Sequence, residues 1–461
     1  MSVCRDDTKL LGRQIEEQLR RNIRRGVLAS GSFLPSSRDL AHQLGVSRPV
    51  VSNAYAQLAG EGFVAMRQGA QPRVAGGAAK RISHRREAAA PAPEFDFLPA
   101  VPDFSSFPRV QWMRAYRKAL QKMRDEDFGY RDPHGCGVLR HAIVEYLGRV
   151  RGVVAEPDQV VITSGFAQSR VLVCWTLRAI GRTCVAVEDP GYADLNLITS
   201  VGLQVAPVPA DEAGLQVDVL ASTRADALMT TPAHQFPTGA VLSSERRRAL
   251  LGWVRTRNVI VLEDDYDSEF RYHRAPNDAL QGLEPARVIY AGTASKILAP
   301  ALRLGWLVVP RTMLDTFHAE QRRLDFGCPR IDQHALAEFL TSGALDQHLR
   351  RLRAVYRRRR DALMEALAAE VPDAVVTGMA AGVHATVRLP STSDEQAIKR
   401  EASRRGIALG TLTPYRINVT SDSPTLLLGY ARISEDNIRA GVRALASAIC
   451  ATRKDTPSCR T

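Results

Sequence analysis

Six residues between positions 264 and 303 carry side chains that could do chemistry together. They are Asp264, Tyr266, Thr293, Ser295, Lys296 and Arg303. Two apolar segments, VIVLE and RVIYAG, precede the first five of them, and each segment is typical of a buried strand. The carboxyl ends of parallel strands meet at the ligand crevice of an α/β sheet. The sequence therefore predicts that a carboxylate, a phenol, two hydroxyls, an amine and a guanidinium converge on one site.

These side-chain types suit pyridoxal 5′-phosphate (PLP). This cofactor binds as a Schiff base to a lysine whose pKa is lowered by burial, which makes Lys296 the candidate catalytic residue. A carboxylate keeps the pyridine nitrogen protonated, and Asp264 is the candidate for it. Tyr266 would hold the phenolate oxygen of the ring. The phosphate requires hydroxyls and an arginine. The candidates for it are Thr293, Ser295 and Arg303.

Two further segments complete this predicted cofactor site. Gly165, Phe166 and Ala167 follow the strand-like segment QVVIT and open a helix, so their backbone amides would face the phosphate. Tyr192, in the segment EDPGY, would stack on the face of the ring. Each piece taken singly is a weak signal, and the prediction depends on their order and spacing.

The chain from residue 106 to residue 461 is predicted to be the domain that positions this site. Strand-like segments alternate there with helical patterns, as in an α/β domain with a mostly parallel sheet. The predicted strands are 159–163, 183–189, 227–231, 259–265, 287–292 and 303–309.

The first 76 residues predict a winged helix-turn-helix. Apolar residues four apart indicate a helix over 8–25, and residues 36–44 form a second. Ser47 is placed to cap a third helix, and Pro49 suits only its first turn. Helix, glycine-containing turn and capped helix is the helix-turn-helix arrangement. Short strands over 63–66 and 71–74 would form the wing.

Residues 77–105 are predicted to be a linker, because alanine, proline and charge replace any apolar periodicity there. A second arginine-rich run, 348–363, could be a further DNA contact. Its apolar residues are spaced as in an amphipathic helix with a solvated basic face, and we prefer that interpretation.

The composition points to a polyanionic partner. The formal net charge is +13, and residues 1–80 carry 12 Lys and Arg against 6 Asp and Glu. Such a basic first segment is typical of a DNA-binding module. No apolar run is long enough to cross a membrane, the N-terminus lacks the features of a signal peptide, and the seven cysteines include no C-x-x-C pair. We therefore expect a cytoplasmic protein without disulfides or a metal site.

The segment GSFLPSSRDLAHQLGVSRPVVSNAYAQLAGEGFVAMRQGAQPRV resembles the GntR family of winged-helix regulators. In that family an arginine of the second helix and the start of the third helix face DNA. The resemblance implies double-stranded operator DNA as a partner. The residues it implicates are Arg38, Arg48, Ser52 and, on the wing, Arg73.

Residues 106–445 resemble the fold-type I aminotransferases, through YRDPHGCGVLRHAIVEYLGRVRGV, EDPGY, TPAHQFPTG and GTASK. In such dimers a tyrosine of the neighbouring subunit touches the phosphate, and Tyr130 matches it. Winged helix, linker and this domain together resemble the MocR (GabR-type) subfamily, of which DDYDSEFRY looks characteristic. The implied fold is a winged helix-turn-helix joined to an α/β PLP-dependent transferase domain with a small C-terminal α+β subdomain. The implied assembly is a homodimer, with a head-to-tail swapped dimer as one form.

Two positions depart from the aminotransferase pattern. Phe236 stands where an asparagine would bond the ring oxygen, and His234 or Gln235 could substitute for it. Leu427 stands where an arginine would clamp a substrate carboxylate, and Arg416 or Arg432 could stand in. Without a clamp, carboxylate recognition weakens. The effector could then be an amino acid, an amine or PLP itself.

Three functions remain open from the sequence. We prefer a PLP-dependent regulator in which an effector sensed at Lys296 alters operator binding, with residual transamination possible. The alternative is an aminotransferase with an accessory DNA-binding module. A third is a regulator whose large domain only dimerises and binds no cofactor. The intact DNA module and the missing clamp favour the first.

Overall fold

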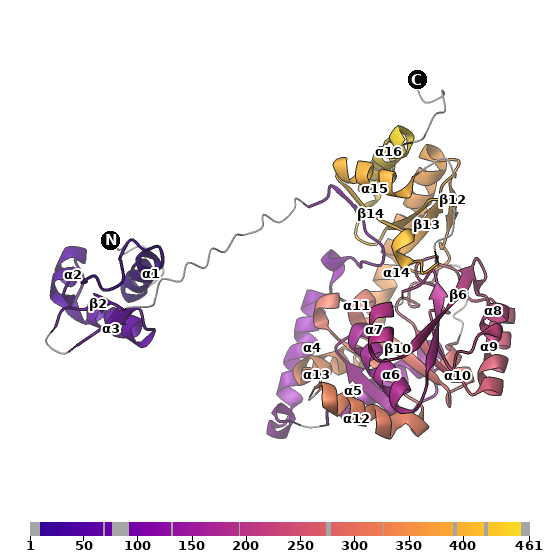
Figure 1. Cartoon of the computed structure of the whole chain (residues 1–461), viewed down its shortest axis with the longest axis horizontal. Coiled ribbons are helices and arrows are strands. Elements are labelled where there is room, and N and C mark those ends of the chain that lie inside the picture. The colour runs from indigo at the N-terminus through magenta and orange to yellow at the C-terminus, as the bar shows by residue number, and fades with distance from the viewer. Residues whose placement is uncertain are drawn as a thin grey trace. The chain divides into compact units, whose positions relative to one another are not determined.

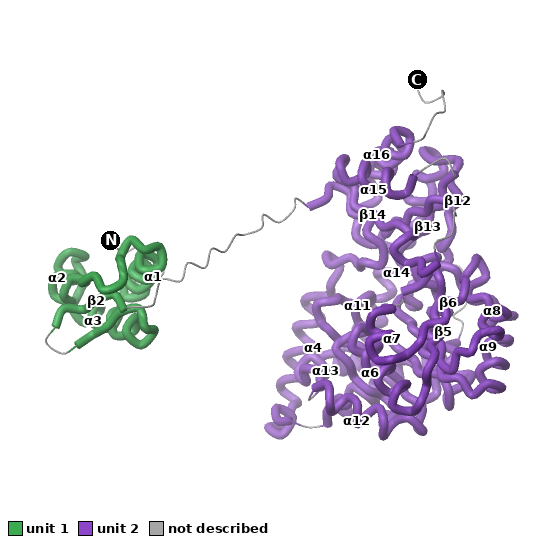
Figure 2. Tube along the Cα trace, viewed as in Figure 1, with its two compact units in different colours: residues 1–91 green, residues 92–461 purple. Residues whose placement is uncertain are grey.

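The computed structural model describes residues 10–67, 70–75, 92–130, 132–192, 194–272, 278–325, 327–390, 394–418 and 423–452. The chain divides into two compact units, residues 1–91 and residues 92–461 (Figure 2). Within the described ranges, no helix combines the length and the apolar character that crossing a membrane requires. The five cysteines in these ranges are all free, and four of them are buried.

The described part of the N-terminal unit contains three helices and a short hairpin (Figure 1). The elements are α1 (Leu11–Arg24), α2 (Ser37–Leu44), α3 (Arg48–Gly60), β1 (Val64–Ala65) and β2 (Arg73–Val74). The two strands pair antiparallel, with Val64 opposite Val74. The predicted winged helix-turn-helix is confirmed.

Local sequence explains where these helices begin and end. The Ser36 side chain accepts a hydrogen bond from the amide of Asp39 at 3.1 Å and so caps α2. Gly45 ends α2 in the left-handed conformation, with φ 64°. Pro49 lies in the first turn of α3, where its missing N–H costs nothing. Ser47 precedes α3 as predicted, but its side chain makes no capping hydrogen bond.

The larger sheet of the second unit has eight strands among the described residues, in the order β4-β11-β10-β9-β8-β5-β6-β7. Neighbours from β10 to β6 run parallel, and β11 runs antiparallel to both β10 and β4. The strands are β4 (Val160–Thr163), β5 (Cys184–Asp189), β6 (Gln204–Asp211), β7 (Gly214–Leu215), β8 (Ala227–Thr230), β9 (Ile260–Asp264), β10 (Val288–Thr293) and β11 (Gly305–Val308). The predicted, mostly parallel sheet is confirmed.

Helices and short 3-10 turns surround this sheet. The helices are α4 (Arg109–Lys122), α5 (Gly137–Arg151), α6 (Phe166–Ala179), α7 (Leu195–Ser200), α8 (Val217–Ser222), α9 (Ser244–Arg257), α10 (Leu280–Leu283), α11 (Ala294–Ile297), α12 (Leu314–Leu324) and α13 (Arg330–Thr341). The 3-10 turns are η1 (Phe104–Ser106), η2 (Asp125–Phe128), η3 (Pro157–Gln159), η4 (Pro300–Leu302), η5 (Arg311–Met313) and η6 (Thr413–Tyr415).

The strands are apolar on both faces, because each face is covered by helices. Val161 and Leu262 pack on one side in a cluster that includes Leu172 of α6 and Phe317 of α12. Their neighbours in sequence point to the opposite side, where Val261 joins a cluster with helix α9. Such mostly apolar strands keep the sheet inside the unit, and most of the polar side chains lie at the strand ends and in the loops.

A smaller sheet forms the C-terminal part of the unit. Its described strands are β12 (Val375–Thr377), β13 (His384–Arg388), β14 (Ile407–Thr411) and β15 (Thr425–Gly429), joined at one edge by β3 (Phe95–Phe97). It is accompanied by α14 (Ala344–Glu370), α15 (Glu395–Arg404) and α16 (Glu435–Thr452) (Figure 1). This is the expected small α+β subdomain.

The predicted linker is wrong in its second part. Residues 92–105 belong to the large unit, because β3 pairs parallel with β14 and the Phe97 side chain is fully buried. Asp103 is also buried and accepts hydrogen bonds from the amide and hydroxyl of Ser105. The prolines and alanines of this stretch surround a three-residue strand, which is too short to produce an alternating apolar pattern in the sequence. Residues 76–91 lie outside the described residues.

The arginine-rich run 348–363 is part of α14. Leu349, Leu352, Tyr356 and Leu363 are buried, so the predicted amphipathic helix is confirmed. Its basic face is only partly solvated. Arg353 donates to the carbonyl of Glu269 at 2.6 Å, for example, so several of these arginines hold the large unit together.

Candidate functional site

The ends of strands β4, β10 and β9 lie side by side. Thr163 at the end of β4 pairs with Gly305 of β11, and Gly305 pairs with Thr293 at the end of β10. On the far side of β10, Ala291 pairs with Asp264, the last residue of β9. The register thus brings the predicted residues of two separate segments to one edge of the sheet.

Gly165 and Arg303 form a cradle at the start of α6. Gly165 has φ 91° and is buried, and a side chain there would place its Cβ 3.3 Å from Nη1 of Arg303. The first amides of α6, beginning at Phe166, have no acceptor within the helix. Arg303 is exposed, with φ 49°, and its side chain makes no hydrogen bond to another described residue. Helix amides beside a guanidinium make a site for an anion such as a phosphate.

Lys296 lies on the single helical turn α11, directly after the end of β10. Beside it, the Thr293 hydroxyl accepts a hydrogen bond from the amide of Ser295 at 3.1 Å and donates one to the Ser295 hydroxyl at 3.0 Å. Lys296 Nζ donates to the carbonyl of Ala100 at 2.6 Å. Burial lowers the pKa of Lys296, and the charge of Asp267 acts in the opposite direction. A lysine with a lowered pKa is a better nucleophile.

Asp264 is buried at the end of β9, and its carboxylate accepts no hydrogen bond from the other described residues. Burial raises its pKa well above the ordinary value, and the neighbouring Asp265 raises it further. The positive charges of Arg170 and Lys296 act in the opposite direction. Asp264 is therefore a carboxylate that needs a cationic partner to stay ionised.

Tyr266 belongs to a buried polar group that the sequence did not predict in full. Its hydroxyl lies 3.0 Å from Nδ1 of His234, and this nitrogen lies 2.9 Å from a carboxylate oxygen of Asp267. Burial raises the pKa of Tyr266 well above its ordinary value. The phenol therefore stays neutral and can donate a hydrogen bond.

His234 and Gln235 are the two residues that could replace the missing asparagine, and their contacts differ. His234 is the one that contacts Tyr266. Gln235 donates from its amide nitrogen to the carbonyls of Pro190 and Phe236, each at 2.8 Å, and so joins its own loop to the loop that follows β5.

Tyr192 is the aromatic residue that was predicted to stack on the ring of the cofactor. It is 54% exposed, and its ring meets that of Phe236 edge-on with centroids 5.8 Å apart. The guanidinium of Arg170 lies 4.9 Å from the centre of the Tyr192 ring. Phe166, Arg170, Tyr192 and Asp264 line the same small cavity. Aromatic, acidic and basic groups thus surround one space at the end of the sheet.

Three further candidates, Tyr130, Arg432 and Arg416, do not line this cavity. Tyr130 is 95% exposed on its own chain. Arg432 pairs with Asp96 at 2.8 Å, and Arg416 lines a separate hollow of about 760 Å³ between the two sheets. Leu427 is fully buried in β15, where it pairs with Thr386 and Gly410.

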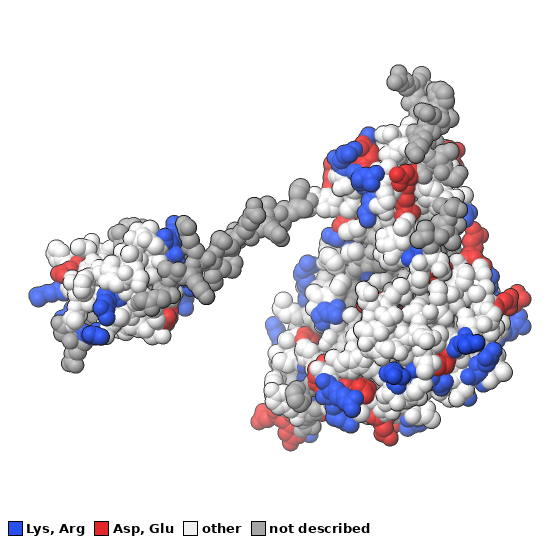
Figure 3. Space-filling view, viewed as in Figure 1, with Lys and Arg blue, Asp and Glu red and all other residues white. Residues whose placement is uncertain are grey.

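The residues assigned to DNA gather on the N-terminal unit. Arg38 of α2 and Arg48 at the start of α3 are exposed, and Nε of Arg48 donates to the hydroxyl of Ser37 at 3.4 Å. Ser52 lies one turn after Arg48, on the same face of α3. Arg73 is exposed on β2. The face seen in Figure 3 shows more basic than acidic side chains on this unit.

Comparison with known proteins agrees with both units. Residues 11–74 match the family of bacterial regulatory proteins of the gntR type, and residues 102–445 match aminotransferase class I and II. The pyridoxine biosynthesis regulator PdxR of Corynebacterium glutamicum is 33% identical over 95% of both chains. The probable rhizopine catabolism regulator MocR of Rhizobium meliloti is 30% identical over 97% of this chain and 95% of its own.

This chain belongs to the MocR-type regulators of the gntR family. It is a transcriptional regulator whose large unit has the fold of an aminotransferase. Among solved structures, the α-aminoadipate aminotransferase LysN of Thermus thermophilus is 28% identical, with a TM-score of 0.70 over 77% of this chain and 92% of its own. A kynurenine aminotransferase of Pyrococcus horikoshii is 27% identical, with a TM-score of 0.70 over 77% and 91%. Their structures contain a phosphopyridoxyl compound and PMP respectively.

Three residues of this MocR-type regulator escaped the sequence analysis. Asp267 lies in the same DDYD run as Asp264, so its position could have been noticed. Arg170 follows Phe166 by one helical turn, which places it on the face of α6 that meets the cavity. Ala100 offers no signal, because a non-glycine residue with φ 56° cannot be read from a sequence.

Proposed function

We propose that this regulator binds PLP at Lys296 and that PLP itself is the ligand that sets its affinity for operator DNA. The observation that carries the proposal is Leu427: an apolar, fully buried side chain stands where an amino-acid effector would need a carboxylate clamp. The other described residues of the site have side chains that suit PLP itself, and the fit requires no additional effector. The likeness to a pyridoxine biosynthesis regulator supports the same ligand.

The residues divide the cofactor between them. The start of α6 at Gly165, Phe166 and Ala167, with Thr293, Ser295 and Arg303, would hold the phosphate. Asp264 would hold the protonated ring nitrogen, Tyr266 would donate to the ring oxygen, and Tyr192 would lie against the ring. When bound, PLP supplies an aldehyde that condenses with the amine of Lys296.

Lys296 also makes a hydrogen bond to the backbone of another segment. Its Nζ donates to the carbonyl of Ala100, a residue held at φ 56°. An alanine in this left-handed conformation is strained by about 1–2 kcal/mol, so its bond to Lys296 helps to keep it there. A lysine that is joined to a ligand no longer offers the same ammonium group to this carbonyl.

The segment 98–103 that contains Ala100 is the route by which the signal leaves the site. On one side it continues into β3 and then, through residues 76–91, to the DNA-binding unit. On the other side Asp103 is fixed, because its amide donates to the hydroxyl of Tyr356 at 3.0 Å and its carboxylate pairs with Arg359 at 2.9 Å. Release of Ala100 therefore acts on the part of the chain that leads to the DNA-binding unit.

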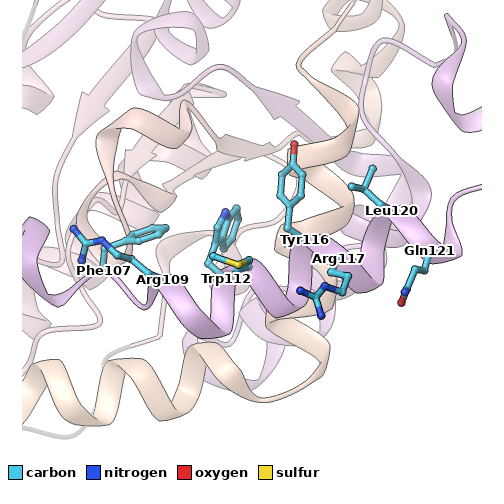
Figure 4. A pocket seen from close by; sticks show the side chains of 8 residues that line it. Phe107, Arg109, Trp112, Tyr116, Arg117, Leu120 and Gln121 are labelled. Carbon is cyan, nitrogen blue, oxygen red and sulfur yellow. The ribbon is translucent and has the colours of Figure 1, made fainter. Parts of the chain in front are cut away.

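We assign Tyr130 to the site of a second copy of the chain. It is almost fully exposed and follows α4, a helix that leaves Val110 and Met113 more than half exposed. Trp112, Tyr116 and Leu120 follow one another along the same helix and line a hollow there (Figure 4). An exposed apolar surface of this kind is typical of a subunit interface. A homodimer would cover it and bring each Tyr130 to the phosphate of the partner.

The experiment measures DNA affinity and visible absorbance together. Full-length protein is titrated with PLP, and its affinity is measured for duplexes selected from a random pool. Pyridoxine 5′-phosphate, which lacks the aldehyde, is the matched control ligand. We expect a visible lysine-bound band and a change in DNA affinity with PLP only.

Lys296→Ala should abolish the band and the response while basal DNA binding persists, because that binding resides in the N-terminal unit. A DNA response that requires an added amino acid would contradict PLP as the ligand. Steady conversion of the cofactor to its pyridoxamine form would favour the alternative function of an aminotransferase. A colourless protein that ignores PLP would mean that the large unit binds no cofactor.

A further inference from the structure

Arg170 is a buried arginine to which the proposed function gives no role. It lies in α6 and is only 8% exposed. Its guanidinium is 5.5 Å from the ring centre of Phe166 and 4.9 Å from that of Tyr192. Nε is buried and has no hydrogen-bond acceptor within the described part of the chain. Burying a charge in this way is costly unless another group uses it.

Its ion pair with Asp194 does not account for that burial. The two groups are 3.7 Å apart, and the Asp194 side chain is 44% exposed. An ion pair of this length with a solvated partner contributes little. Asp194 in addition accepts a hydrogen bond from the amide of Leu197 and so caps α7. Asp194 therefore has its own structural role.

The buried carboxylate of Asp264 explains the position of Arg170 better than Asp194 does. Both side chains line the same cavity. Asp265 and Asp267 lie near enough to Asp264 to disfavour its ionised form, and the two cations that oppose them are Arg170 and Lys296. A Lys296 side chain joined to an aldehyde no longer has a free ammonium group, because its nitrogen becomes part of the ligand. Of the two cationic side chains that act on Asp264, Arg170 is the one that the ligand would leave unmodified.

We propose that Arg170 is a positioning residue for the cofactor: its guanidinium keeps Asp264 ionised against the ring nitrogen and holds the Tyr192 ring at the mouth of the same cavity. The proposal rests on PLP binding at Lys296. It adds a role for α6, which then presents backbone amides to the phosphate at its first turn and a charge to Asp264 one turn later. One helix thus contacts both ends of the ligand.

The test compares three variants of the full-length protein. Arg170→Leu removes the charge, Arg170→Lys keeps it, and Arg178→Leu is the matched control, because Arg178 is an exposed arginine of the same helix. PLP dissociation constants are measured from pH 6 to pH 9 through the visible band. Basal DNA affinity and the unfolding temperature are measured in parallel as checks of the fold.

We expect Arg170→Leu to weaken PLP binding about tenfold near neutral pH, which corresponds to about one pKa unit at Asp264. Removal of the cation raises the pKa of Asp264, so the acid limb of the affinity profile moves to higher pH. Arg170→Lys keeps the charge but loses the planar group over the Tyr192 ring, so its loss should be clearly smaller than that of Arg170→Leu, and Arg178→Leu should match the parent. Equal losses in Arg170→Leu and Arg170→Lys would mean that only packing is involved, and the proposal would be wrong.

A second background tests whether the effect passes through Asp264. In Asp264→Asn the carboxylate is absent, so adding Arg170→Leu should cost almost nothing more. The same tenfold loss in both backgrounds would overturn the proposal. If the parent protein takes up no PLP, the proposed function itself fails. If the parent binds PLP and Arg170→Leu binds it equally well, only the role of Arg170 fails.

Discussion

The two units place their functional charges in opposite environments. In the N-terminal unit, Arg38, Arg48 and Arg73 are exposed. In the large unit, Asp264 and Tyr266 are buried among groups that shift one another's pKa values. DNA is large and approaches charges that already face water, whereas a small ligand must replace contacts that the protein makes with itself. Changes in the first unit should therefore act singly, and changes in the second should act on several groups at once.

The largest expected effect is in the exposed set. Arg38→Ala combined with Arg48→Ala should weaken DNA binding about 100-fold, because hydrogen bonds to charged groups contribute about 1.5–3 kcal/mol each. The parent should show a log–log salt slope of roughly −4 to −7, and the double variant should lose about two units of slope. Fluorescence anisotropy at several salt concentrations measures both quantities. PLP uptake should be unchanged, and a parent slope near zero would refute DNA binding altogether.

The next effect concerns Ala100, the half-buried residue of the large unit whose carbonyl accepts from Lys296. Ala100→Gly removes the penalty of the left-handed conformation, roughly 1–2 kcal/mol, and so stabilises the state in which Lys296 is bonded to residue 100. PLP binding should weaken by about fivefold or more, and the DNA response should require correspondingly more PLP. Ala100→Pro is the opposite control, because proline cannot adopt φ 56°. Identical PLP titrations for both variants would contradict a role of this segment in transmission.

A smaller effect is a pH dependence of stability confined to the large unit. The Nε2 atom of His348 lies 3.0 Å from the carbonyl of Ile297, next to Lys296, and burial lowers the pKa of His348 to about 4. A histidine whose folded pKa lies below its unfolded value resists protonation in the folded state. The free energy of unfolding should then be intact above about pH 6.5 and fall as the pH drops toward 4.

His348→Gln keeps a side-chain N–H but cannot titrate, so the fall in stability over this pH range should become shallower. Chemical denaturation followed at several pH values, with separate probes in each unit, measures the difference. Parallel pH dependence in the parent and the variant would mean that other groups, such as His318 with its pKa lowered to about 4, dominate the acid response.

What the sequence could predict follows the same division. The helices and wing of the N-terminal unit depend on neighbours in sequence, such as Ser36 and Asp39, and they were predicted closely. The strand ends of the site were also predicted, because apolar runs followed by polar residues are local patterns. Arg170 and Ala100, which lie beside Asp264 and Lys296, could not be predicted from the sequence. They reach the site only through the packing of α6 and of the 98–103 segment. β3 was missed for the same reason, since its pairing with β14 joins residues far apart in the chain.

The smallest expected effect tests whether an exposed basic surface of the large unit also binds DNA. Arg350 and Arg351 are exposed on α14, in the most basic run of the large unit, and no hydrogen bond from either side chain is recorded among the described residues. Changing both to glutamate should leave DNA affinity within about twofold and the salt slope unaltered, because we expect the contacts with phosphate to come from the N-terminal unit. Anisotropy measurements beside the Arg38 and Arg48 variant provide the comparison. A slope that falls by about two units would show that α14 also touches DNA, and the separation of roles between the two units would then be incomplete.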